Sequence, residues 1–391
     1  MSQPKIYICA SAHFPHGDAG ANRIQYIAQG LQLASYDVAV LSCGQTPKTA
    51  VLENGWYTYA GVPYRNLELK SVKKEKLLSG YLMVSLMKKC GVKRGDIVYL
   101  YGSNSMYISP ILSFCKRHGI KTVIDVVEWH QPFQYPKKEK DIRYRSANKT
   151  FTKLAPKTDA IVSISECIAE YYREKHCNTQ VFPVIIDADG IPFDCDKKAT
   201  DNQVHLIYPG NPMYKDDIEV MLKGLAELTE AERSRLQFHL TGVKEEKLRS
   251  FLGDGQHVFD TLKDTVVFHG WMEYEELIAL YQKVDFLYMS RPDNLVTRAN
   301  FPSKLPELMA YGIAPIGNRV GDYYRYLTDG EDSVLFNENT PEACAEALRR
   351  VLQMNREEQK RMCEKARHTV CEQFDYPKWA DRLRQFMESI K

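Results

Sequence analysis

Residues 300–322 read NFPSKLPELMAYGIAPIGNRVGD, and this stretch decides the fold. The spacing of Leu305, Leu308 and Met309 predicts one apolar face of a short helix. The apolar run that follows ends near Gly321 and is typical of a buried strand. A helix that leads directly into a strand is typical of folds in which the two elements alternate.

The same stretch carries polar side chains that suit an anionic ligand. We expect Ser303 to cap the helix, so that backbone N–H groups near Ser303 and Lys304 form an anion site to which Lys304 adds a positive charge. Glu307 lies one turn further on the same face, where its carboxylate can accept two hydrogen bonds from a vicinal diol such as a ribose. The alternative is a capped surface helix in which Lys304 and Glu307 form a weak ion pair.

Beyond this stretch, the chain repeats the alternation of helices and strands in two halves. Both halves read as short β-rich runs separated by amphipathic helical patterns, which predicts parallel sheets covered by helices. Between them, residues 192–203 are polar and rich in turn residues, so we place a domain boundary near 195–203. The expected strands are KIYICA, DVAVLS, DIVYLY, KTVIDVV and DAIVSIS in the first half, and VHLIYPG, LQFHLTG, TVVFHGWM and DFLYMS in the second.

Length and composition agree with this division. A chain of 391 residues exceeds one ordinary core, and its 44% hydrophobic and 26% charged residues are typical of a globular protein. The ten cysteines are scattered without a C-x-x-C pair, so we expect reduced thiols, no metal site and a cytoplasmic location. We find no secretory signal and no apolar run long enough to span a membrane.

The net charge of +2 hides a division between the halves. Residues 1–198 carry a net charge of +9 and the remaining residues −7, with +12 concentrated in residues 65–153. Such a block suggests an acidic partner surface, and the alternative is a solvated basic face without a partner.

Two glycine-bearing strand ends provide further candidates. Gly210 lets the backbone approach a ligand after VHLIYP, and Lys215 can reach a diphosphate there, although a turn with a solvated lysine is the alternative. In the first half, the loop HFPHGDAGANR contains Gly20 and ends at Arg23, which could bind a phosphate. The loop lacks the G-x-G-x-x-G pattern of dinucleotide-binding proteins.

The strand KTVIDVV is followed by Glu128 and His130. Polar groups at the carboxyl end of a parallel strand lie at the usual ligand edge, where they can bind sugar hydroxyls or move protons. The alternative is a buried structural Glu/His pair.

Together these pieces resemble the GT-B glycosyltransferases of family 4, also called glycosyl transferases group 1. The resemblance covers nearly the whole chain, and its most specific segment is 302–336, with P-S-K-x-x-E-x-M-A-x-G, then G-D and D-G-E-D. It implies two Rossmann-like domains facing across a cleft: an acceptor-binding domain at 1–198, a sugar-nucleotide-binding domain at 199–374, and a C-terminal helix at 375–391 that crosses back to the first.

The resemblance also implies a reaction: transfer of a sugar from a UDP- or GDP-linked donor with retention at the anomeric carbon and without a metal or other cofactor. Lys215 and Lys304 would meet the diphosphate, Ser303 would contribute backbone, and Glu307 would bind the ribose. The family's usual Glu-x7-Glu signature lacks its first carboxylate here, because position 299 is alanine. Its task would pass to Asn294, Arg298, Asn300 or main-chain groups, and Asn211 replaces the usual arginine after Gly210.

The resemblance therefore favours a hexosyltransferase-like enzyme (EC 2.4) acting in polysaccharide or glycolipid assembly. The expected partners are the nucleotide sugar and a glycan or lipid-linked acceptor, with peripheral contact to the anionic inner leaflet and none with nucleic acid. Two alternatives remain open: a GT-B sugar-nucleotide epimerase and a non-catalytic nucleotide-sugar-binding protein.

Overall fold

The computed structural model describes residues 4–16, 19–69, 73–194, 201–212 and 215–390. Within it the chain forms two compact units. The first comprises Met1–Ile186, Ala299–Phe301 and Asp375–Lys391, and the second comprises Asp187–Arg298 and Pro302–Phe374. Much of the boundary expected at 195–203 lies outside the described residues.

The first unit is built on an eight-stranded sheet in the order β3-β4-β2-β1-β5-β6-β7-β8. Each neighbouring pair is parallel except β3 and β4, which form an antiparallel hairpin at one edge. The strands are β1 Lys5–Ala10, β2 Asp37–Ser42, β3 Tyr57–Tyr59, β4 Val62–Asn66, β5 Ile97–Tyr101, β6 Lys121–Val126, β7 Ala160–Ser163 and β8 Thr179–Val181. The helices are α1 Ala19–Leu33, α2 Lys73–Lys89, α3 Ser105–His118, α4 Ile142–Lys149, α5 Glu166–Arg173 and α15 Ala380–Glu388.

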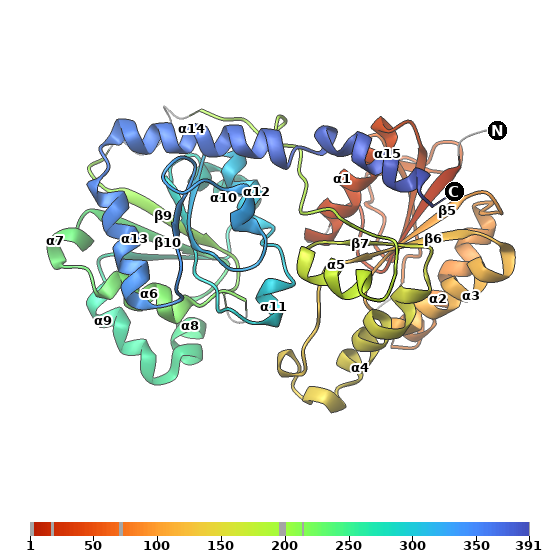
Figure 1. The fold of residues 1–391 in the computed structure, drawn as a ribbon, viewed down its shortest axis with the longest axis horizontal. Helices are drawn as coiled ribbons and strands as arrows, with labels where there is room; N and C mark the ends of the chain where they lie inside the picture. Colours follow the sequence, from red (N-terminus) through yellow and green to blue (C-terminus); the bar gives the residue numbers. More distant parts are fainter. Residues whose placement is uncertain (1–3, 17–18, 70–72, 195–200, 213–214, 391) are drawn as a thin grey trace. The chain divides into compact units, whose positions relative to one another are not determined.

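The core of this unit joins the two ends of the chain. Ile6 and Val38 from the sheet pack in one cluster with Leu31 of α1 and Leu383 of α15. A Cβ at Gly30 would lie 2.7 Å from Cδ1 of Leu383, so the glycine in α1 makes room for the last helix. Figure 1 shows α15 beside α1, and α15 thus completes the core of the first unit.

The second unit is built on a six-stranded parallel sheet in the order β11-β10-β9-β12-β13-β14. Strand β9 is buried at every position, as parallel strands covered on both faces are. The strands are β9 Val204–Pro209, β10 Leu236–Thr241, β11 Val266–Gly270, β12 Phe286–Tyr288, β13 Ala314–Asn318 and β14 Val334–Phe336. The helices are α6 Ile218–Ala226, α7 Glu230–Arg233, α8 Glu245–Leu252, α9 Val258–Leu262, α10 Tyr274–Tyr281, α11 Leu295–Arg298, α12 Lys304–Ala310, α13 Pro341–Gln353 and α14 Arg356–Gln373.

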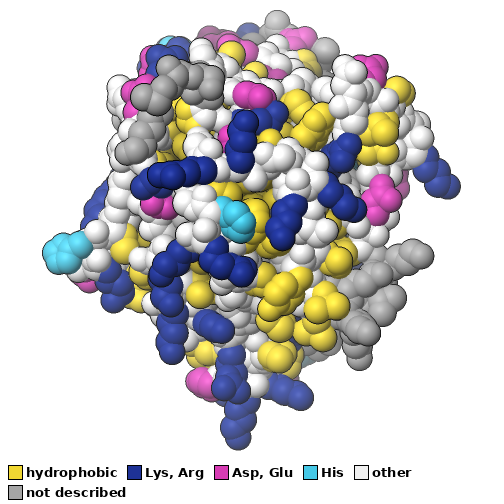
Figure 2. All heavy atoms as spheres, turned by 90° about the vertical axis from the view of Figure 1, so that its right-hand side faces the viewer, with side chains coloured by type: hydrophobic (Ala, Val, Ile, Leu, Met, Phe, Trp, Pro, Cys, Tyr) yellow, Lys and Arg dark blue, Asp and Glu magenta, His cyan; other side chains and the backbone are white. Residues whose placement is uncertain are grey.

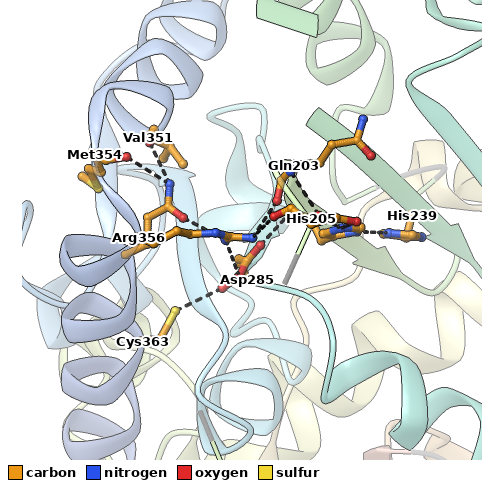
Figure 3. Close-up of polar contacts among 10 residues, drawn as sticks. Gln203, His205, His239, Asp285, Val351, Met354, Arg356 and Cys363 are labelled. Atoms are coloured by element: carbon orange, nitrogen blue, oxygen red, sulfur yellow. Dashed lines mark hydrogen bonds and ion pairs between the residues drawn. The ribbon is translucent and has the colours of Figure 1, made fainter. Parts of the chain in front are cut away.

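A polar network holds the start of α14 against this sheet (Figure 3). The Arg356 guanidinium lies 3.2 Å from the buried Asp285 carboxylate and donates to the Gln203 carbonyl at 2.8 Å. The other Asp285 oxygen accepts from the backbone N–H of His205 at 2.8 Å, and the Cys363 thiol donates to the Asp285 carbonyl. These contacts fix α14 to the amino-terminal ends of β9 and β12.

Two parallel sheets, each with its helices, confirm the predicted α/β class with two Rossmann-like domains. None of the described helices combines the length and the apolar character needed to cross a bilayer. The cysteines that the structure describes form no disulfide.

Candidate active site

Three glycines line the carboxyl edge of the second sheet. Gly210, Gly242 and Gly270 follow or end the neighbouring strands β9, β10 and β11, and each has a positive φ that favours glycine. A Cβ at Gly242 would lie 3.0 Å from Cα of Gly210, whereas Cβ atoms at Gly210 and Gly270 would face open space. Backbone is therefore accessible here for close approach by a ligand. Asn211 is exposed at the same edge.

A buried ionic cluster lies beside this edge, and Lys304 is part of it. The Lys304 ammonium is 2.9 Å from Oδ2 of Asp216 and 3.6 Å from the ring centre of Tyr208, the fifth residue of β9. The Tyr208 hydroxyl donates to the same carboxylate oxygen. Nε of Arg291, which follows β12, lies 3.0 Å from the other oxygen and forms an ion pair without an aligned hydrogen bond.

The cluster carries a net positive charge, because its cations outnumber its single carboxylate. Burial would raise the pKa of Asp216, but the charges of Lys304 and Arg291 lower it to about 2, so the carboxylate is ionised. Burial lowers the pKa of Lys304, Asp216 opposes this, and the positive charges of Arg291 and Lys215 lower it further. Lys215 thus lies within electrostatic reach of Lys304, and the group carries a net positive charge that suits an anion.

Glu307 follows Lys304 by one turn of α12, as expected. Its side chain is partly exposed, and no hydrogen bond to its carboxylate is found among the described residues. Burial raises the pKa of this carboxyl group. Hydroxyl donors from a ligand would stabilise its charged form.

The structure corrects the expectation for Ser303. Its backbone is already helical, with φ −61° and ψ −28°, and its side chain makes no capping hydrogen bond. The preceding turn is instead closed by the Leu305 N–H donating to the Pro302 carbonyl at 3.1 Å. The expected cap by Ser303 is therefore wrong. Anion binding by the backbone N–H groups near Ser303 and Lys304 stays a prediction.

Asn294 and Arg298, which were candidates for the task of the missing carboxylate, have local roles. The Asn294 side chain accepts from the backbone N–H groups of Val296 and Thr297, so it begins α11. The exposed Arg298 guanidinium pairs with both oxygens of Asp293, with one contact of 2.7 Å. Ala299, where the resemblance would place the carboxylate, is buried.

In the first unit, the expectation that Arg23 binds phosphate is wrong. The Arg23 side chain is 4% exposed and forms two bonds to Asp125 of β6, at 2.8 and 3.0 Å. It also donates to the carbonyls of Phe182 and Pro183, so four of its five N–H groups have partners inside the protein. Gly20 is buried in the first turn of α1. Arg23 is thus a structural bridge between α1, β6 and the segment after β8.

Glu128 and His130 lie together just after β6. Nε2 of His130 is 3.5 Å from the Glu128 carboxylate, and Nδ1 is 2.9 Å from the Tyr135 hydroxyl. Both side chains are partly exposed, which permits contact with a ligand. The pair is available for proton transfer or for binding hydroxyl groups.

Asp216 and Arg291 were missed by the sequence interpretation. Signals for both are present in the sequence, because Asp216 directly follows Lys215 and Arg291 directly follows the predicted strand DFLYMS. Side chains at the carboxyl end of a parallel strand point to the ligand edge. Among the described residues, no group of three or more His, Cys, Asp or Glu is placed to hold a metal ion.

A separate groove of about 750 Å³ lies between α13, α14 and the turn at Gly330. Its lining mixes Arg350, Arg361 and Lys365 with Glu331 and Glu358, so neither charge dominates. It includes none of the predicted site residues, and we place the candidate site at the glycine-lined strand edge instead.

Comparison with known proteins identifies a matching family model and similar folds. Residues 194–369 match the model of the family "Glycosyl transferases group 1". No curated protein matches the chain in sequence. The chain is similar in structure to a glycosyltransferase from Rickettsia africae, with TM-score 0.69, 15% identity, and coverage of 100% of this chain and 99% of the other.

Two further solved structures show the same fold. One is HepE from Anabaena in complex with UDP and glucose, with TM-score 0.65, 12% identity, and coverage of 99% and 100%. The other is WaaG, a glycosyltransferase involved in lipopolysaccharide biosynthesis, with TM-score 0.64, 16% identity, and coverage of 97% and 99%. The chain therefore has the GT-B fold of these glycosyltransferases, and its residues 194–369 match the model of the glycosyl transferases group 1.

Proposed function

We propose that this protein is a retaining glycosyltransferase that moves a sugar from a UDP- or GDP-linked donor to a glycan or lipid-linked acceptor. The observation that carries the proposal is the cationic cluster of Lys304, Arg291 and Asp216, with Lys215 in reach, beside the glycine-lined edge of a group 1 domain. The Anabaena protein of the same fold binds UDP and glucose, which supports a nucleotide-sugar donor.

In the proposed mechanism, Lys215 and Lys304 stabilise the leaving diphosphate in place of a metal ion. Negative charge on this group grows as its bond to the sugar breaks, so cations fixed near it lower the barrier. Glu307 accepts hydrogen bonds from the ribose hydroxyls. Glu128 and His130 contact sugar hydroxyls or move the proton of the acceptor.

The donor site is tested with Glu307→Ala. Hydrogen bonds to a charged group contribute roughly 1.5 to 3 kcal/mol, so the affinity for the nucleoside diphosphate should fall roughly 10- to 150-fold. Calorimetric titration with UDP and GDP measures this, and Glu246→Ala, an exposed glutamate of α8, is the matched control.

Several outcomes would count against the proposal. Unchanged affinity in a folded Glu307→Ala variant would show that Glu307 does not bind the ribose. Wild-type protein that binds neither diphosphate has no donor site of this kind. Binding without diphosphate release in the presence of a panel of sugar donors and acceptors identifies a non-catalytic binding protein.

The proposed acceptor is lipid-linked, and an exposed apolar stripe on α2 supports this. A Cβ at Gly80 would lie 2.5 Å from the Tyr107 carbonyl of α3, so that side of α2 packs inward. Other positions of α2 expose Leu77, Tyr81 and their neighbours to solvent, with Tyr81 66% exposed. The stripe consists of Leu77, Leu78, Tyr81 and Leu82.

Basic side chains accompany the apolar ones on this unit. Figure 2 shows lysine and arginine side chains interspersed with apolar ones on one face of it. Around α4, Phe133 and Ile142 are exposed beside a basic cluster, which consists of Lys137, Lys138, Lys140, Arg143, Arg145, Lys149 and Lys153. Apolar side chains next to cations suit an anionic lipid surface. We therefore place the enzyme at the cytoplasmic face of a membrane as a peripheral protein that acts in polysaccharide or glycolipid assembly.

A further inference from the structure

A buried carboxylate stands at the centre of the proposed diphosphate site. The Asp216 side chain is 6% exposed and lies in the loop between β9 and α6. Its Oδ2 accepts from the Lys304 ammonium and the Tyr208 hydroxyl, and its Oδ1 faces Nε of Arg291. An acidic group so close to a site for an anion requires a physical explanation.

The contacts of Lys304 suggest one. A lysine side chain is flexible, and its ammonium takes many positions unless other groups hold it. Here the carboxylate of Asp216 holds it at 2.9 Å while the ring of Tyr208 lies beneath it, and the side chain keeps an exposed fraction of 20%. Two contacts thus fix the ammonium in a side chain that is not fully buried.

The charges around Lys304 make the carboxylate necessary. Arg291 and Lys215 are both positive, and together with burial they lower the pKa of Lys304. Asp216 is the group that opposes them, since its negative charge and its hydrogen bond both raise that pKa. Tyr208 adds no charge, because burial raises the pKa of its hydroxyl well above the usual value. Without Asp216, repulsion from Arg291 would favour a displaced or neutral Lys304.

The carboxylate does not cancel the attraction for an anion. Arg291 and Lys304 bring two positive charges against the one negative charge of Asp216, and Lys215 adds a third within electrostatic reach. Because the surplus is positive, a diphosphate is still attracted to the cluster.

We infer that Asp216 is a positioning residue, which holds the Lys304 ammonium over Tyr208 so that it meets the diphosphate of the donor. This inference rests on the proposed function for the identity of the ligand. It assigns Asp216 an indirect role, through Lys304, and not a contact with the substrate.

The experiment measures the dissociation constant of UDP or GDP, whichever the wild type binds, between pH 6.5 and 9.5. Asp216→Asn keeps the shape of the side chain and removes its charge, so affinity should fall about tenfold at pH 7 and further as the pH rises. Wild-type affinity should fall less as the pH rises, because Asp216 raises the pKa of Lys304. Asp254→Asn, an exposed aspartate of the same unit, is the matched control.

A double-mutant cycle separates positioning from a general structural role. If Asp216 acts through Lys304, Asp216→Asn should change affinity little in a Lys304→Ala background. Equal losses in both backgrounds, or a wild-type pH profile in the single variant, would overturn the inference. If Asp216→Asn does not fold, Asp216→Glu decides, because it keeps the charge but moves it: lower affinity with an unchanged pH profile supports positioning, and wild-type affinity overturns it.

A second readout does not depend on the proposed function. Acetic anhydride modifies the neutral amine of lysine, and mass spectrometry follows the rate at Lys304. This rate at pH 8 should rise in Asp216→Asn, because loss of the carboxylate charge and of its hydrogen bond lowers the pKa of Lys304. Faster labelling without nucleotide binding in the wild type would reject the proposed donor but retain the contact between Asp216 and Lys304. Equal labelling rates would reject the role of Asp216.

Discussion

At the residue scale, Arg23 and Lys304 show how partners decide what a cation does. Both follow glycine-bearing or turn segments and both were candidates for phosphate binding. Arg23 meets Asp125, which is 102 positions away, and two backbone carbonyls. Lys304 meets Asp216, 88 positions away, and retains an accessible fraction. Contacts at such separations are set by the assembled sheet, so local sequence patterns could predict the cations but not their partners.

Arg23→Ala should therefore destabilise the fold and leave nucleotide binding intact. The change leaves the Asp125 carboxylate buried without its guanidinium, which typically costs about 3 to 5 kcal/mol of unfolding free energy. Urea denaturation measures this, with Arg117→Ala on the exposed face of α3 as control. A stable variant with weakened nucleotide affinity would instead indicate that Arg23 binds phosphate.

At the element scale, the strands were easier to predict than the side-chain contacts between different elements. The expected strands VHLIYPG and LQFHLTG are confirmed as β9 and β10, because both are β-rich runs that end at a glycine. The short strands β3, β4, β8 and β14 were missed, since three to five residues give too little pattern to separate from loop. The candidate site was predicted in part. Lys304 and Glu307 share one helix, so their proximity could be predicted from the sequence. Asp216 is brought to the site only by the tertiary fold.

A row of histidines crosses three neighbouring strands of the second sheet. Nδ1 of His205 in β9 lies 3.0 Å from Nε2 of His239 in β10, and Nδ1 of His239 lies 2.9 Å from Nε2 of His269 in β11. Figure 3 draws the contact between His205 and His239. Nε2 of His205 is 3.1 Å from the Asp201 carboxylate. Burial, with the neighbouring His205 and His269, lowers the pKa of His239 to about 4, and burial lowers that of His269.

Stability should consequently fall as the pH drops from about 6.5 to about 4. In this window the unfolded chain protonates His239 and the folded chain does not, so the unfolded state binds more protons and gains roughly 2 to 4 kcal/mol. The contribution of neutral His239 to the free energy of unfolding is fully present above pH 6.5. Urea midpoints from pH 8 to 4 measure the slope, which should be shallower in His239→Gln than in the wild type. His257→Gln, whose side chain is 81% exposed, is the control, and equal slopes for wild type and His239→Gln would contradict the assignment.

At the scale of the whole molecule, charge is divided along the chain. Residues 1–198 carry +9 and the remaining residues −7, although the sum is only +2. The unit that carries the excess also exposes the apolar stripe of α2, and its basic residues around α4 are solvent-exposed. A solvated basic surface does not require apolar side chains beside it, and a membrane-binding surface does. The stripe therefore adds to the charge argument an observation that the sequence pattern alone did not provide.

The membrane proposal separates into an electrostatic part and an apolar part that respond differently to salt. Each lysine or arginine near an anionic surface contributes about 1 kcal/mol, which salt screens, whereas buried apolar side chains are little affected. Co-sedimentation with vesicles containing anionic lipid should fall steeply between low and high salt, and replacing the lysines of residues 137–153 by glutamine should abolish it.

Leu77→Ser with Leu78→Ser should weaken binding at every salt concentration. Val51→Ser with Leu52→Ser, an exposed apolar pair of the same unit, is the matched control. If the wild type stays in the supernatant at low salt, the basic face is a solvated surface, and a soluble glycan becomes the better candidate for the acceptor.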